Sequence, residues 1–146
     1  MLSSLVLLFD PLRDPMRLRA EIVRALEQIH IERDAGGDPD PRPIAVCLSK
    51  ADGLVRDLAD YRQAIEDPDA FVRRHLDPTL VRSLDRYCAL YRFFPVAAVG
   101  LDLAWGVVTP RLLVDERGRT RPVPGGTTLP LLAPFVWVFD QLRRRS

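Results

Sequence analysis

Three short, uninterrupted apolar runs place the strongest constraint on the fold of this chain. Each run is five to seven residues long, and each stops abruptly at a polar residue or a glycine. Continuous apolar runs of this length are typical of strands that are covered on both faces, as in a parallel sheet. The sequence therefore predicts a buried sheet built from these three runs: Leu5–Phe9, Ile44–Leu48 and Phe93–Val99.

The segments between the runs have helical periodicity. Apolar residues recur at spacings of three and four over 18–29, 80–91 and 132–139, and a shorter helix is predicted from about Gly53 to Ile65. A carboxylate next to a proline marks a helix start, because the carboxylate caps the first turn and proline suits it. Three such pairs occur: Asp14-Pro15, Asp67-Pro68 and Asp77-Pro78.

Alternation of strands and helices predicts an α/β fold, with three layers (α/β/α) and a mostly parallel sheet. The 146 residues suit one domain, 1–146. A β-hairpin is expected as an insertion at about 107–124, and the polar segment Arg33–Pro43 is expected to be a surface loop. Trp105 and Trp137 are expected to pack in the core or against the hairpin.

Composition excludes several classes of function. The net charge of +1 and the lack of aromatic residues among the arginines argue against nucleic-acid binding. No apolar run approaches the roughly 18 residues of a membrane span. Cys47 and Cys88 have no disulfide or zinc spacing, and His30 and His75 have no partner at ligand spacing, so no metal site is predicted. A cytoplasmic protein is expected.

One four-residue motif carries most of the functional information. Ser49-Lys50-Ala51-Asp52 follows a predicted buried strand and opens a predicted helix, and Lys50 is the only lysine among 21 Lys and Arg residues. The motif resembles the Asn/Thr-Lys-x-Asp guanine-specificity motif of Ras-like, translation-factor-related P-loop GTPases. The resemblance implies that Asp52 accepts the ring N–H and amine of guanine, with Ser49 and Lys50 completing the base-binding loop.

Further segments follow in the order of the same family. Asp10 resembles the aspartate of an Asp-x-x-Gly segment, which implies a position on the magnesium side, but Arg13 replaces the glycine. The segment at Ala97–Gly100 resembles the Ser-Ala segment, which implies that the Ala98 backbone amide contacts guanine. Residues 130–142 resemble the last helix of prokaryotic GTPase domains associated with conflict and defence systems. The implied ligands are GTP or GDP with Mg²⁺.

The resemblance covers only the second half of the family's domain, because no Gly-x4-Gly-Lys-Ser/Thr loop occurs in the sequence. Without that loop the triphosphate has no cradle of backbone amides. No catalytic residue is assigned, and the isolated chain is expected to bind GTP weakly and not to hydrolyse it. The first hypothesis is a degenerate or truncated GTPase-like regulatory domain.

Two alternatives stay open. One is a non-catalytic interaction scaffold that keeps the GTPase-like fold, and the other is an unrelated flavodoxin-like domain in which the motif is accidental. In the Ras-like strand order, another strand lies between those ending at Asp10 and Leu48. We therefore expect either direct pairing of these two strands, or a protein partner or a missing N-terminal segment that completes the sheet.

Overall fold

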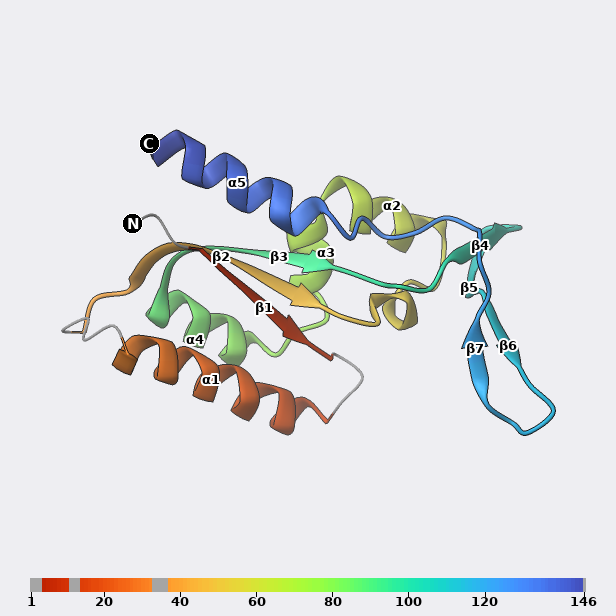
Figure 1. Ribbon diagram of the computed structural model, residues 1–146, viewed down its shortest axis with the longest axis horizontal. Coiled ribbons are helices and arrows are strands. Elements are labelled where there is room, and N and C mark those ends of the chain that lie inside the picture. Colours follow the sequence, from red (N-terminus) through yellow and green to blue (C-terminus); the bar gives the residue numbers. More distant parts are fainter. Residues whose placement is uncertain (1–3, 11–13, 33–36, 146) are drawn as a thin grey trace.

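A computed structural model describes residues 4–10, 14–32 and 37–145 of the chain (Figure 1). Its elements form a mixed α/β arrangement, in which a small parallel sheet is accompanied by helices and two hairpins. In chain order the elements are β1 (Leu5–Phe9), α1 (Pro15–Glu32), β2 (Asp40–Leu48), the short 3-10 helix η1 (Ala51–Leu54), α2 (Leu58–Glu66), α3 (Pro68–Arg73), α4 (Pro78–Tyr87), β3 (Cys88–Pro95), β4 (Leu101–Ala104), β5 (Val107–Pro110), β6 (Leu112–Val114), β7 (Thr120–Pro122) and α5 (Ala133–Arg145).

The sheet has the order β1-β2-β3, and both pairings are parallel. The first two predicted runs lie in β1 and β2, which pair directly, with Leu5 opposite Ile44 and Phe9 opposite Leu48. Of the two arrangements left open by the sequence, direct pairing is the one formed. A further strand of this sheet would therefore have to join an outer edge.

The third strand lies earlier in the chain than predicted. We expected Phe93–Val99, whereas β3 spans Cys88–Pro95, and the helix expected to reach residue 91 ends at Tyr87. Cys88 already has extended backbone angles (φ −124°, ψ 121°) and lies opposite Asp40 of β2. Backbone pairing with β2 thus outweighs the helical spacing of the side chains. Local periodicity cannot reveal this pairing, because the partner strand lies far away in the sequence.

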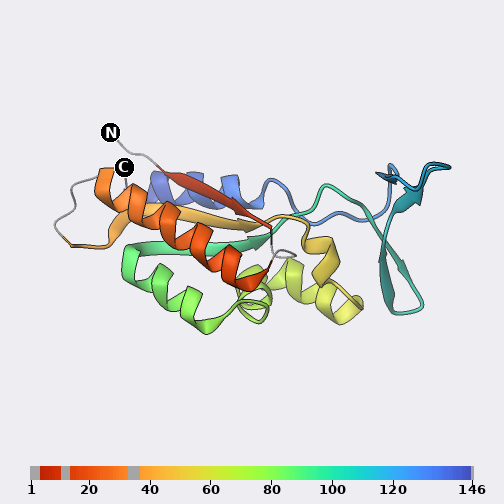
Figure 2. The ribbon, with the colours of Figure 1, turned by 90° about the horizontal axis from the view of Figure 1, so that it is seen from below.

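Helices pack on both faces of the sheet (Figures 1 and 2). On one face, apolar residues of α1 and α4 cluster with Ile44, Val46 and Leu48 of β2. On the other face, Trp137 and Val138 of α5 pack with Ala45, Cys47 and Phe94. The alternation along β2 follows from the two-residue period of a strand, and it explains why this run is apolar throughout.

The three predicted Asp-Pro helix starts are confirmed. Helices α1, α3 and α4 begin at Pro15, Pro68 and Pro78. In each case the preceding aspartate accepts a hydrogen bond from a backbone amide of the first turn, at 2.8 to 3.1 Å. These caps satisfy donors that the helix itself leaves unpaired.

Two other local predictions need correction. The helix expected from Gly53 to Ile65 is divided, because Asp57 caps a new helix, α2, by accepting a hydrogen bond from the Asp60 amide. The segment expected to be a loop up to Pro43 joins the sheet at Asp40, which is buried and pairs with Arg42. Residues 33–36 of that segment fall outside the described ranges.

Two hairpins extend beyond the sheet (Figure 1). The predicted insertion forms as the antiparallel pair β6–β7, and a second hairpin, β4–β5, precedes it. Trp105 occupies the turn of β4–β5 with a positive φ of 55° and is fully exposed. The expectation that Trp105 packs in the core or against a hairpin is therefore wrong, because its side chain at this turn is fully exposed.

Within the described ranges, no helix is long and apolar enough to cross a membrane. Both cysteines are buried thiols, and burial raises the pKa of Cys47 to about 11 and that of Cys88 to about 12. Neither thiol is thus a thiolate near neutral pH.

Truncating a fully buried side chain should test the packing of α4 on the sheet. Leu84 lies in the core below the sheet, and Leu84→Ala is expected to lower the free energy of unfolding by about 2–5 kcal/mol. Leu113→Ala on the β6–β7 hairpin removes the same atoms from a side chain that is 63% exposed, so it should cost less than about 0.5 kcal/mol. Urea unfolding followed by circular dichroism measures both, and equal losses would contradict this packing.

Candidate functional site

The carboxyl ends of the three parallel strands meet along one edge of the sheet, here called the rim. The Ser49 amide and hydroxyl both donate hydrogen bonds to the Phe9 carbonyl, at 2.6 and 2.9 Å. On the other side, the Val96 amide donates to the Leu48 carbonyl at 2.9 Å, and the Ala51 amide to the Val96 carbonyl at 3.2 Å. The loops after β1, β2 and β3 are thus joined to one another, as expected for the ligand-binding end of a parallel sheet.

Lys50 and Asp10 form an ion pair on this rim. The Lys50 Nζ lies 2.6 Å from Oδ2 of Asp10, and the lysine side chain is largely exposed while that of Asp10 is mostly buried. The backbone of Lys50 is left-handed (φ 53°, ψ 30°), a conformation that is uncommon for a residue with a side chain. This turn redirects the chain from β2 into η1. The two predicted residues therefore come together, although 40 positions separate them.

Asp52 occupies the first turn of η1 and is half-buried. No hydrogen bond or ion pair engages its carboxylate within the described ranges. A carboxylate has about four acceptor positions, so Asp52 can still accept two N–H groups from a ligand. The hydroxyl of Ser49 is already used by the Phe9 carbonyl, and Ser49 therefore positions the loop.

Ala98 lies in the bend that follows β3 and is exposed. In the part of the chain that the structure describes, its backbone amide donates no hydrogen bond, whereas the neighbouring Val96 amide is used within the rim. Ala98 can thus offer one donor beside the loop that carries Lys50 and Asp52. The rim combines an open carboxylate, an exposed ammonium group and a free amide.

Metal binding receives no support from the arrangement of ligand-type residues. No group of three or more His, Cys, Asp or Glu side chains comes together in the described ranges. Oδ2 of Asp10 contacts the Lys50 ammonium group, which would have to move before a cation could bind this oxygen. The assignment of Asp10 to a magnesium side stays a prediction.

Sequence reasoning missed a second polar cluster, which lies directly after the motif. Asp60 of α2 is only 5% exposed, and its carboxylate contacts the guanidinium groups of both Arg56 and Arg74. Burial tends to raise the pKa of Asp60, but the hydrogen bonds from Arg56 and Arg74 outweigh it, and the pKa is lowered. The spacing from Arg56 to Asp60 is visible as an ordinary i,i+4 pair. The contact between Arg74 and Asp60 depends on the fold, so the sequence pattern does not show it.

Comparison with family models, with curated proteins and with solved structures gave no match to this chain. The functional argument therefore rests on the geometry of the rim and on the residues around it.

The left-handed turn at Lys50 predicts an unusual order of stability for two variants. Lys50→Ala and Lys50→Gly both lose the exposed ion pair, worth about 0–1 kcal/mol. Only glycine relieves the left-handed backbone, which costs other residues about 1–2 kcal/mol, while glycine's greater freedom in the unfolded chain takes back about 0.5–1 kcal/mol. Lys50→Gly should therefore be about 0.5–1 kcal/mol more stable than Lys50→Ala.

A comparison of alanine with glycine at a helical position provides a control, because there alanine should be the more stable of the two. Ala20 is an exposed residue of α1, where Ala20→Gly should cost about 1 kcal/mol. Urea unfolding measures all three variants. An alanine variant at position 50 that is more stable than the glycine variant would show that this turn is not left-handed.

Proposed function

We propose that the rim is a guanine-recognition site in an incomplete, P-loop GTPase-like domain with a three-layer arrangement. Asp52 accepts the ring N–H and exocyclic amine of guanine, Lys50 lies along the base, and the Ala98 amide donates to the guanine oxygen. Adenine lacks this pair of donors and has an acceptor in place of the ring N–H, so the carboxylate discriminates between the two bases.

One observation carries this proposal. The motif Ser49–Asp52 is joined by a backbone hydrogen bond to Val96, directly before the Ala97–Gly100 segment, and Asp52 and the Ala98 amide have no partner in the described ranges. Lys50 is held by an exposed ion pair, which salt screens and a ligand can exchange at little cost. A base could therefore bind without breaking the buried contacts of the rim.

Phosphate binding is expected to be the weak part of the site. The sequence contains no glycine-rich phosphate loop, and most of the affinity for a nucleoside triphosphate requires such a cradle. We therefore propose a regulatory, pseudo-GTPase role in which GTP or GDP with Mg²⁺ binds weakly and is not hydrolysed by this chain alone. Hydrolysis would require a phosphate loop supplied by another segment or by a partner.

Nucleotide discrimination tests the proposal directly. GMP, AMP and XMP carry the same phosphate and differ only in the base, so their relative affinities report base recognition. GMP should bind about tenfold or more tightly than AMP, since a lost charge-assisted contact is worth roughly 1.5–3 kcal/mol. Backbone amide shifts of Asp52 and Ala98 in two-dimensional NMR titrations provide the measurement.

Reversal of the preference is the sharper result. Asp52→Asn presents an amide donor to the C2 oxygen of xanthine, so this variant should prefer XMP, while Asp38→Asn at an exposed position should leave the GMP preference unchanged. Equal binding of GMP and AMP, or an Asp52→Asn variant that still prefers GMP, would refute guanine recognition. Low-micromolar binding of GTP would refute the account of the missing phosphate cradle.

A second candidate function, an interaction scaffold, is favoured by the uncovered edge of the sheet. Val6 and Leu8 lie opposite Ala45 and Cys47, so they share the face on which α5 packs. Helix α5 covers β2 and β3 but leaves these two side chains exposed, Leu8 by 66%. No charge or proline interrupts β1, although edge strands usually carry such protection. We propose that a strand of a partner protein or of another segment pairs with β1.

An open strand edge should make the isolated chain associate with itself at high concentration. Leu8→Lys places a charge on the edge and should shift the chain towards monomer. Leu113→Lys is a matched control, because Leu113 on the β6–β7 hairpin is exposed to a similar extent, 63%. Sedimentation velocity over a concentration series distinguishes the variants. A monomeric wild-type chain, or equal effects of both substitutions, would contradict an interacting β1 edge.

A further inference from the structure

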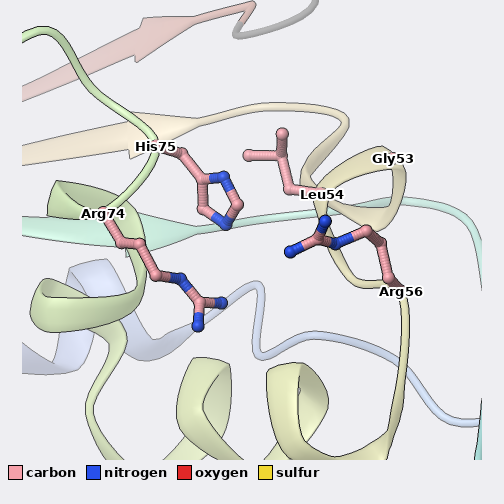
Figure 3. Close-up of a pocket in the computed structure, with 5 residues that line it drawn as sticks. All are labelled: Gly53, Leu54, Arg56, Arg74 and His75. Carbon is pink, nitrogen blue, oxygen red and sulfur yellow. The ribbon is translucent and has the colours of Figure 1, made fainter.

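A pocket with a cationic lining lies beside the rim, and we call it the arginine pocket. Its volume is about 340 Å³, and it is lined by Gly53, Leu54, Arg56, Arg74 and His75. Gly53 and Leu54 belong to η1, whereas Arg74 and His75 follow α3 in the chain. Figure 3 shows that the two guanidinium groups and the imidazole ring point toward one another across this space.

Both arginines contact the buried carboxylate of Asp60. Arg74 approaches Oδ1 of Asp60 at 2.6 Å, and Nε of Arg56 approaches Oδ2 at 3.4 Å. The backbone amide of Arg56 also donates to Oδ2 at 3.1 Å. Asp60 is not among the residues that line the pocket, so it holds the Arg74 guanidinium without occupying the space, and Arg74 loses little further side-chain entropy on binding a ligand.

The imidazole of His75 is positioned from below by an aromatic residue. Its ring centroid lies 5.0 Å from that of Phe71, which is fully buried, and the guanidinium of Arg74 lies 5.3 Å from the same ring. Nε2 of His75 is buried and has no hydrogen-bond partner in the described ranges. This atom has almost no accessible surface, so His75 contributes to the pocket through its position and its charge.

The charges in this region do not balance. Two guanidinium groups meet a single carboxylate, which leaves a net charge of +1, and Asp60 engages one nitrogen of each guanidinium. The Arg56 side chain is 77% exposed, so its remaining donors are accessible. Planar guanidinium groups bind tetrahedral and planar oxyanions through paired hydrogen bonds.

We propose that the arginine pocket binds an oxyanion of the phosphate class, with Arg56 and Arg74 as its hydrogen-bond donors and with His75 adding positive charge when its ring is protonated. This site is distinct from base recognition at the rim, and it does not depend on it. The excess cationic charge supplies the attraction, and the two guanidinium groups approach the pocket from different elements. The pocket is larger than one phosphate group, so the anion can be part of a larger molecule.

Protonation of His75 couples binding to pH. Burial and then the charge of Arg74 lower its pKa, with a smaller contribution from Arg56, while Asp60 acts in the opposite direction. A bound dianion favours the protonated ring and raises this pKa. By linkage, the anion binds more tightly as the pH falls through the pKa of the complex, since binding takes up a proton.

Anion titrations of the full chain, followed by NMR, test the proposal. Inorganic phosphate should shift the signals of His75, Gly53 and Arg74 in a saturable manner at constant ionic strength, whereas chloride should not. Arg56→Gln should weaken phosphate binding at least fivefold and still fold, because the Arg74–Asp60 pair and the backbone hydrogen bond to Asp60 remain. Arg62→Gln, an exposed change of the same charge on α2, should have no effect beyond general screening.

Sulfate serves for the pH series because its charge is constant over the range. Its affinity should rise several-fold between pH 7.5 and 6.0 in the wild-type chain and stay level in His75→Gln, which keeps a donor but cannot titrate. Acetate and phosphoserine separate the two sources of oxyanion, and stronger binding of phosphoserine identifies the phosphoryl group. The proposal is overturned by shifts that do not saturate, by equal responses to chloride and phosphate, or by unchanged binding in Arg56→Gln. Since GMP and AMP share their phosphate, failure here leaves base discrimination at the rim untouched.

Discussion

The position of β2 between two parallel neighbours determines how the rest of the chain is arranged. Its residues from Ile44 to Leu48 are buried on both faces, and its backbone pairs with β1 on one side and β3 on the other. In this dry environment every backbone donor and acceptor needs a partner. The hydrogen bonds from Ser49 to Phe9 and from Val96 to Leu48 continue this pairing past the strand ends, so the rim is an extension of the sheet.

The two proposed sites are joined by the short segment η1. Asp52 lies in its first turn, and Gly53 and Leu54 line the arginine pocket. The sites differ in how firmly their charges are held. Lys50 is an exposed cation in a pair that salt screens, whereas the buried carboxylate of Asp60 holds the Arg74 guanidinium and the Arg56 backbone amide. A ligand at the rim can thus replace the Lys50–Asp10 contact, whereas a ligand in the arginine pocket would bind with the Arg74–Asp60 contact still in place.

Local sequence patterns predicted the elements whose causes are local. Helix starts at Asp-Pro pairs and the runs of β1 and β2 were found because capping and two-sided burial leave marks on adjacent residues. The limits of β3, the buried Asp40 and the exposed Trp105 were not found. The limits of β3 and the burial of Asp40 depend on contacts between strands that are far apart in the sequence, and the exposure of Trp105 reflects the absence of such a contact. Apolar character alone also does not distinguish a buried tryptophan from an exposed one.

The sequence by itself determined the residue types at the ends of the strands, including the lone lysine and Asp52, because these follow directly after apolar runs. Only the tertiary structure decided that Lys50 meets Asp10 and that Arg74 meets Asp60. These partners are 40 and 14 residues apart. Their approach follows from the parallel register of the strands and from the turn between α3 and α4, and no local pattern encodes either.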